Sequence, residues 1–179
     1  MIPFPSGANA PGFDDPLEML HACHGKILRQ CDTLQKLCVH LTKHGCDEAA
    51  QQAAQGILRY FDTAGKFHHQ DEEQDLFPAL RSSADQASLH ALLERLLAEH
   101  VVMLSAWEEL RAELQAVAGG THGTITDGLK DRFIESHTAH IAIEEAELLP
   151  LAAKVLGAKQ LASLGVRMAA RRSVVTVLT

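Results

Sequence analysis

Apolar side chains recur with a helical period of about 3.6 residues along most of the chain. The first periodic stretch starts at Asp15-Pro16, where an aspartate at the N-cap and a proline at the first helical position are typical of a helix start. It stops near Gly45, a residue suited to the end of a helix. Turn-forming residues separate the later stretches, which cover about residues 47–80, 86–117, 126–149 and, as a shorter amphipathic piece, 158–171. The pattern therefore predicts an all-α protein.

Four long helices joined by short turns favour an up-down-up-down four-helix bundle with a short additional C-terminal helix. We expect a flexible Pro/Gly-rich tail over residues 1–14, the bundle over 15–157, and a C-terminal helix and tail over 158–179. The last stretch, 171–179, is apolar and prone to form a strand, so it packs on the bundle or joins a partner.

One segment of the chain occurs twice. Residues 68–78 and 140–150 both read His-x-x-x-Glu-Glu-x-x-Leu-x-Pro. On a helix, residues four apart lie on the same face, so each copy can direct an imidazole and a carboxylate at one point. Pro78 and Pro150 occupy matching places, where each is expected to kink or end its helix.

The repeat extends upstream of these segments. His24-x3-Leu28-x5-Leu34 matches His100-x3-Leu104-x5-Leu110, so each half of the chain reads as a helical hairpin with one further inward histidine. Packing the two hairpins about a pseudo-twofold axis would bring six candidate metal ligands together: His24, His68, Glu72, His100, His140 and Glu144.

The chemistry of this set excludes several metals. Four imidazoles argue against calcium or magnesium, which prefer oxygen ligands, and six groups are too many for one structural zinc ion. Imidazole with carboxylate suits iron, manganese, zinc or cobalt. Six protein ligands suit two ions bridged by the carboxylates, with an open position for a small ligand.

The doubled motif with its two upstream histidines resembles the hemerythrin-like (HHE cation-binding) family, over about residues 15–156. The resemblance implies a helical bundle holding two carboxylate-bridged non-haem iron ions, with the six residues above as ligands and zinc or manganese as substitutes. The chain departs from the oxygen-carrying hemerythrins at two positions. Leu96 stands where those proteins have a fifth histidine, and Glu144 follows His140 by four residues where theirs is an aspartate five residues on. Sensing or redox roles are therefore expected over oxygen storage.

Neighbouring polar residues are candidates for completing the site. Three histidines near the six are candidate additional ligands or pocket-edge residues: His21, His69 and His137. Some iron-sensing relatives use a ligand at the position of His69. Glu73 and Glu145 are interpreted as solvent-facing charges or as partners of ligand histidines, and Asp75 as a residue that orients one.

Composition and charge limit the partners and the cellular location that we expect for the protein. The net charge of −7 argues against nucleic acid or an anionic membrane as the main partner. No apolar run approaches the roughly 20 residues that span a bilayer, and the N-terminus lacks the features of a signal peptide, so we expect a cytoplasmic protein. The four cysteines read as small buried hydrophobes, with a redox role for Cys23 or Cys46 as the alternative.

Two classes of function fit these features. The first is a binding or sensing protein for O2, NO or iron itself, which would signal through a partner or as a homodimer. The alternative is a di-iron redox enzyme that reduces peroxide or NO or oxidises Fe2+. No catalytic base is evident outside the ligand set, which favours the first class.

Overall fold

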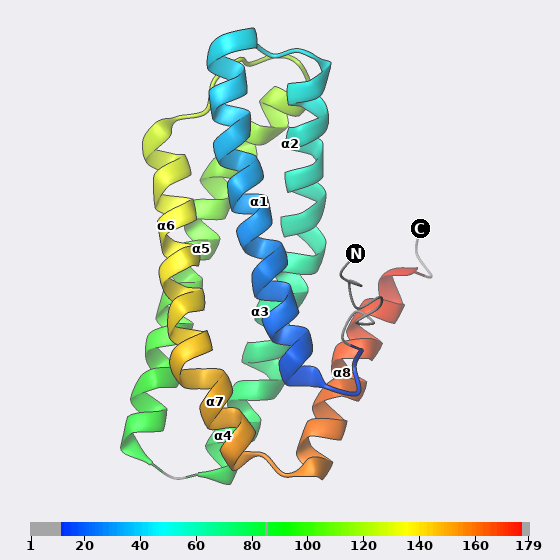
Figure 1. Cartoon of the computed structure of the whole chain (residues 1–179), viewed down its shortest axis with the longest axis vertical. Coiled ribbons are helices and arrows are strands. Elements are labelled where there is room, and N and C mark those ends of the chain that lie inside the picture. Colours follow the sequence, from blue (N-terminus) through cyan, green and yellow to red (C-terminus); the bar gives the residue numbers. More distant parts are fainter. Residues whose placement is uncertain (1–11, 85, 177–179) are drawn as a thin grey trace, which may run out of the picture.

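The computed structural model describes residues 12–84 and 86–176, and within them it contains helices and no strand (Figure 1). The first helical rod is α1 (Pro16–His44). The second joins α2 (Glu48–Tyr60), η1 (Phe61–Gly65), α3 (Lys66–Asp71), η2 (Glu72–Leu76) and α4 (Phe77–Ser83). The third is α5 (Ala87–Ala118), and the fourth joins α6 (Asp127–Ile143), η3 (Glu144–Leu148) and α7 (Leu149–Val155). The elements named η are π-helical turns, and α8 (Ala158–Thr176) follows the four rods. The prediction of an all-α protein is confirmed.

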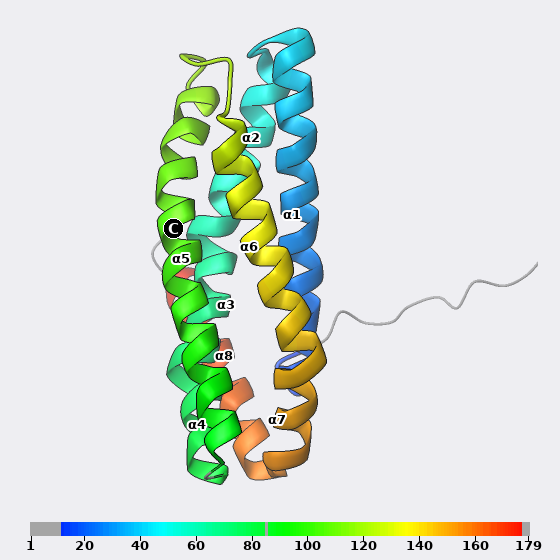
Figure 2. The ribbon, with the colours of Figure 1, turned by 90° about the vertical axis from the view of Figure 1, so that its left-hand side faces the viewer.

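The four rods lie side by side along the long axis of the molecule, and successive rods run in opposite directions (Figures 1 and 2). Contacts close a ring, because α1 packs on α2, α2 on α5, α5 on α6 and α6 on α1. None of the helices in the described part of the chain is both long and apolar enough to cross a membrane.

Local chemistry explains where the first two rods begin. Asp15 caps α1 by accepting a hydrogen bond from the backbone N–H of Glu18 at 3.1 Å, as the sequence predicted. Asp47 caps α2 in the same way through the N–H of Ala50 at 2.9 Å. Between them, Gly45 has a φ of 74°, which a residue without a Cβ adopts at no steric cost.

The two motif prolines do not end their helices. Pro78 and Pro150 each lie in the first turn of the α-helix that follows a π-helical turn. In η2 the N–H of Phe77 donates to the carbonyl of Glu72, and in η3 the N–H of Leu149 donates to that of Glu144. Instead of the expected kink or end, each rod has a widened turn before its proline. One extra residue in that turn accommodates the backbone hydrogen bond that the proline cannot donate.

The core consists of two apolar clusters separated by a polar layer. One cluster includes Ile27, Ile57 and Phe133, and the other includes Leu20 and Leu148. On α1, His24 lies one turn from Leu20 and one turn from Ile27, so the buried histidines and carboxylates occupy the level between the clusters.

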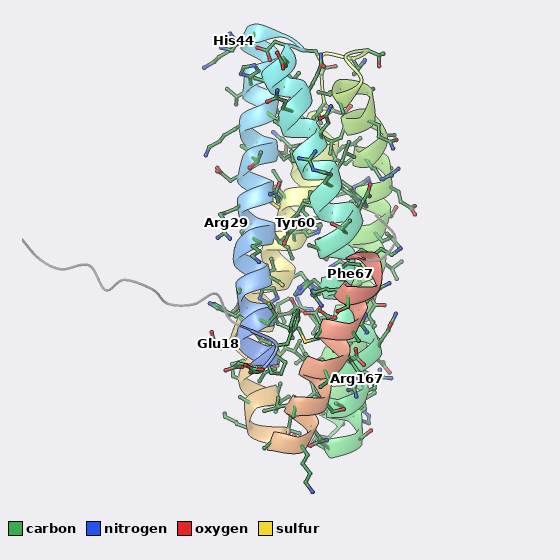
Figure 3. All side chains as sticks on the ribbon, turned by 90° about the vertical axis from the view of Figure 1, so that its right-hand side faces the viewer. Glu18, Arg29, His44, Tyr60, Phe67 and Arg167 are labelled. Atoms are coloured by element: carbon green, nitrogen blue, oxygen red, sulfur yellow. The ribbon has the colours of Figure 1, made fainter. Side chains whose placement is uncertain are left out.

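Helix α8 packs against α1 and α3, and Figure 3 shows it lying over the half of the bundle below Phe67. Leu164 and Met168 are fully buried in the lower apolar cluster. The expectation of a strand-prone tail is wrong for residues 171–176, which continue α8. Residues 177–179, and residues 1–11 of the expected N-terminal tail, lie outside the described part of the chain.

All four cysteines lie in described regions and are free. Cys23 and Cys31 are buried and Cys38 and Cys46 are partly buried, as expected for small hydrophobes. Burial raises the pKa of Cys31 to about 12, which makes its thiol unreactive near neutral pH.

Candidate metal centre

The six side chains predicted as ligands converge in the middle of the bundle, and each is at most 4% exposed. Each rod contributes to the set: His24 from α1, His68 and Glu72 from α3 and η2, His100 from α5, and His140 and Glu144 from α6 and η3. They form two overlapping groups, in each of which one ligand atom per residue lies within 4.8 Å of the others. The first group is His24, His68, Glu72 and Glu144, and the second is Glu72, His100, His140 and Glu144.

Glu144 lies between two histidines, with one oxygen toward each. Its Oε2 is 3.1 Å from Nε2 of His24, and its Oε1 is 3.1 Å from Nε2 of His140. The carboxylate therefore offers one oxygen to each of the two groups.

Glu72 has the same arrangement as Glu144. Its Oε1 is 3.4 Å from Nε2 of His68, and its Oε2 is 3.5 Å from Nε2 of His100. Two carboxylates placed in this way could bridge two cations, each of which would also contact two imidazoles.

Several of these buried atoms lack hydrogen bonds. Both oxygens of Glu72, both oxygens of Glu144 and Nε2 of His24 have no hydrogen-bond partner. Buried polar atoms without partners are costly, so a cluster of them that converges on one place fits a bound cation. The donor set and its geometry are therefore those of a metal site.

Carboxylates outside the cluster orient three of the four histidines. Nδ1 of His24 lies 2.5 Å from Glu145 Oε1, and Nδ1 of His100 lies 2.7 Å from Glu73 Oε1. A carboxylate accepts a hydrogen bond from Nδ1, which leaves the Nε2 lone pair free to bind a metal. Glu73 and Glu145 are therefore hydrogen-bond partners of ligand histidines, which is one of the two roles interpreted for them from the sequence.

The third orienting carboxylate is Glu99, whose Oε2 lies 2.8 Å from Nδ1 of His140. Sequence reasoning missed this residue because it acts on a different helix, and no spacing along α5 signals that contact. With both Nδ1 atoms directed at carboxylates, Nε2 of His100 and Nε2 of His140 face each other at 3.0 Å. Two lone pairs at that separation repel each other, whereas two nitrogens bound to one metal ion lie about this far apart.

The two central carboxylates differ in their acidity. Burial and the neighbouring Glu144 hold the pKa of Glu72 well above its usual range. Burial also acts to raise the pKa of Glu144, but the imidazoles of His140 and His24, each 3.1 Å from one of its oxygens, outweigh burial and hold that pKa well below the ordinary value. Two facing carboxylates that are both negatively charged repel each other, and bound metal ions would offset this repulsion.

The additional candidate histidines lie around the centre, and none of the three belongs to either converging group. His21 is on the surface and lies 2.9 Å from Glu145. His69 stacks on His100 with ring centroids 4.1 Å apart. His137 is buried, and its Nδ1 donates to the carbonyl of Phe133 at 2.8 Å.

Asp75 does not orient a ligand histidine, so that expectation is wrong. It is buried and pairs with two arginines of α8, Arg171 at 2.6 Å and Arg167. Asp71 is fully buried and pairs with Arg171 and, at 2.7 Å, with Arg172. Asp71 and Asp75, which lie on either side of Glu72 in the sequence, therefore hold this part of the second rod against α8.

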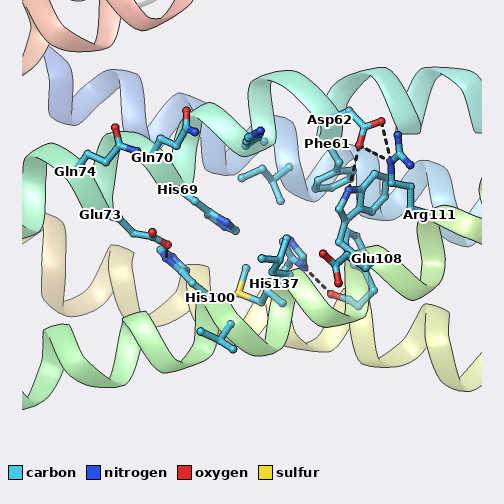
Figure 4. Close-up of a pocket in the computed structure, with 18 residues that line it drawn as sticks. Phe61, Asp62, His69, Gln70, Glu73, Gln74, His100, Glu108, Arg111 and His137 are labelled. Atoms are coloured by element: carbon cyan, nitrogen blue, oxygen red, sulfur yellow. Dashed lines mark hydrogen bonds and ion pairs between the residues drawn. The ribbon is translucent and has the colours of Figure 1, made fainter.

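A cavity of about 780 Å³ borders the centre on the side of α3 and α5. His69, His100 and His137 line it, as Figure 4 shows. This cavity gives a route from the surface to one ligand histidine.

Comparison with known proteins identifies a family and a relative. The family model described as the hemerythrin HHE cation binding domain matches residues 15–152. A protein of Haemophilus influenzae described as uncharacterized is 36% identical over 162 residues, which cover 90% of this chain and 92% of that protein.

Proposed function

Because the chain belongs to the hemerythrin HHE cation-binding family, we propose that its buried cluster binds two metal ions bridged by Glu72 and Glu144. The observation that carries this proposal is the sharing of the two carboxylates. Each of them presents one oxygen to each half of the cluster, and each half has two histidines of its own.

Iron is the metal we propose for both positions, with zinc or manganese as substitutes that the same nitrogen and oxygen donors accept. Two histidines and two shared carboxylates give each ion four protein ligands, fewer than the six of an octahedral site. A pair of iron ions would supply one-electron redox chemistry and open positions for a diatomic ligand such as O2 or NO. Glu73, Glu99 and Glu145 would hold the imidazoles in orientation, while the apolar clusters above and below exclude water.

Binding or sensing of O2, NO or iron is the role we infer over oxygen storage. Leu96 is fully buried in the lower apolar cluster, so α5 offers no second histidine one turn before His100. A redox enzyme acting on peroxide, NO or Fe2+ is a second candidate. The cavity that reaches His100 favours it, because a substrate could approach the centre there.

The proposal also covers the topology of the bundle, the location of the protein and its partners. We infer an up-down-up-down bundle from the ring of contacts among α1, α2, α5 and α6. Four free cysteines support a reducing cytoplasmic environment. Such a sensor would act through a partner or as a homodimer.

Metal analysis of iron-loaded protein, with Mössbauer spectra, tests the centre. We expect two equivalents of iron per chain in the wild type and a loss of at least one in the double variant His68→Ala/His140→Ala. His122→Ala is the matched control, because His122 is exposed in the loop before α6. Full stoichiometry in the double variant would refute the proposed ligands.

The role is then decided by adding O2, NO or hydrogen peroxide to the iron-loaded protein. A reversible spectral change without turnover supports a binding protein. Steady-state consumption of the added molecule supports the enzyme.

A further inference from the structure

The cavity beside the centre is much larger than a diatomic ligand needs. A water molecule occupies about 30 Å³ in the liquid, whereas this cavity has a volume of about 780 Å³. Sites for small organic molecules have about 300–1,000 Å³. The volume therefore suits an organic molecule of many heavy atoms.

Apolar and polar side chains both line the cavity, with Gln70 and Gln74 among the polar ones. Phe61, Met103 and Phe133 line it and are at most 7% exposed, and the partly buried Trp107 contacts the rings of Phe61 and Phe133. At the mouth, Val101 is 69% exposed. An apolar molecule in the cavity would cover these side chains, so water is the less favourable occupant.

Leu104 lies one turn beyond Val101 on α5 and is 55% exposed. The two side chains continue the apolar wall out to the surface. A long apolar body could therefore extend from the interior to the mouth.

Uncharged polar groups stand at the inner end of the cavity. The Nδ1 of His137 donates to a backbone carbonyl, so the Nε2 of its neutral ring can only accept a hydrogen bond. Neither that Nε2 nor the ring nitrogens of His69 have a hydrogen-bond partner among the described residues, and Figure 4 shows both side chains directed into the space between the helices. They offer one acceptor and one further donor or acceptor to a bound molecule.

The charged side chains around the cavity largely neutralise one another. Arg111 donates to Asp62 at 2.8 Å. Glu73 keeps its negative charge, because the His100 ring that donates to it is neutral, but its side chain is 41% exposed to solvent. Lys66 and Glu108 add one charge of each sign at exposed positions on the rim. The one charge left over is the solvent-exposed Glu73 carboxylate, so none of the charged lining residues stands beside the buried His137 to select an ionic ligand there.

We propose that this cavity binds an uncharged organic molecule with an apolar body and one hydroxyl group, whose O–H donates to Nε2 of His137. The apolar body contacts Phe61, Met103 and Trp107. The bound hydroxyl then lies beside His69 and His100, at the edge of the metal centre. Binding itself needs no particular metal, so the inference goes beyond the proposed function.

Trp107 is the chain's single tryptophan and lines the cavity, so its fluorescence reports binding directly. The test titrates full-length, zinc-loaded protein with 1-decanol and, separately, with decyl methyl ether, which lacks the O–H donor. We expect a saturable change in emission with 1-decanol, at an affinity about fivefold higher than that of the ether, as one net hydrogen bond supplies. The absence of a saturable change with 1-decanol overturns the proposal.

Three variants locate the bound molecule. His137→Leu should remove the preference for the alcohol while the ether still binds. Val101→Glu should weaken both probes at least tenfold, whereas Val102→Glu should leave both unchanged, because Val102 is also exposed but does not line the cavity. A preference that persists in His137→Leu, or equal effects of the two valine variants, contradicts the proposal.

The valine pair keeps the test decisive if the buried His137→Leu variant does not fold. Zinc content measured on the same samples separates the two proposals. Loss of zinc binding bears on the metal centre, and loss of 1-decanol binding in zinc-replete protein bears on the cavity.

Discussion

At the scale of single residues, the carboxylates behind the histidines set which ring nitrogen faces the centre. Glu99 holds Nδ1 of His140 at 2.8 Å, and its side chain also accepts from Arg95 at 2.9 Å. A residue fixed in this way keeps the imidazole in one tautomer and one orientation. The affinity for metal therefore depends on residues that do not touch the ion.

Replacing Glu99 by alanine should lower the affinity for zinc or iron about 10- to 100-fold, because His140 loses the acceptor that orients it. Competition with a chelator of known affinity measures the change. Glu94→Ala serves as the control, since Glu94 is exposed on the same helix. Equal affinities of the two variants would show that the hydrogen bond to His140 does not matter.

A second residue-scale prediction concerns acid stability. Burial lowers the pKa of His137 to about 4, so the folded protein keeps this ring neutral. An unfolded chain binds the proton with a pKa of about 6.5. The free energy of unfolding should therefore fall as the pH drops from about 6.5 to about 4, by up to about 3 kcal/mol from this group.

Urea unfolding across that pH range, in metal-free wild type and His137→Leu, isolates the contribution. The variant should show a shallower dependence on pH, because a leucine has no proton to bind. Parallel curves for the two proteins would mean that His137 titrates alike in the folded and unfolded chains.

At the scale of elements, the sequence predicted what depends on local chemistry and missed what depends on packing. Asp15 and Gly45 carry their own capping signals, so the ends of α1 were predictable. A proline such as Pro78 lacks an N–H whether the helix stops, kinks or widens. Which of these occurs depends on contacts between rods, and therefore η2 and η3 were not foreseen.

The end of α8 shows the same limit. Its β-branched residues favour a strand when judged by propensity alone. In the structure this segment is helical, and Arg171 and Arg172 form long-range ion pairs with the buried carboxylates of Asp71 and Asp75. Nothing near the arginines in the sequence indicates such partners, which lie about a hundred residues away.

Removing these ion pairs should destabilise the protein. In Arg171→Gln/Arg172→Gln, Asp71 remains fully buried without its cations, and a buried charge left in this state costs about 3–5 kcal/mol. Part of that cost is relieved by solvent, because Arg172 is 23% exposed. We expect a fall of about 2–3 kcal/mol in the free energy of unfolding, measured with urea.

Lys159→Gln is the control for the arginine variant, since Lys159 is exposed near the start of α8. Adding Asp71→Asn to the double variant should restore part of the stability by removing the unpaired charge. If Lys159→Gln and the arginine variant unfold alike, the ion pairs do not stabilise the fold.

At the scale of the whole molecule, two apolar clusters supply the stability and the polar layer between them costs some of it. The periodic pattern and the doubled motif predicted this layer, because His68 and His140 recur at the same place in each half. The sequence did not predict the cavity, since Trp107 and His69 come from different rods and only the distance between the rods leaves space. Helix contacts are foreseeable from periodicity, whereas the gaps between them are not.

Metal binding should therefore stabilise the whole bundle. A ligand that binds only the folded state at a thousand times its dissociation constant contributes about 4 kcal/mol, which for a chain of this size corresponds to a rise of about 10 °C in the melting temperature. Differential scanning calorimetry with and without zinc measures the shift. The rise should be much smaller in His68→Ala/His140→Ala, which lacks one proposed ligand of each ion, whereas metal held by surface histidines would stabilise that variant as much as the wild type. Because each rod contributes side chains to both apolar clusters, we expect the clusters to unfold together in both proteins, as a single transition whose midpoint depends on the metal mainly in the wild type.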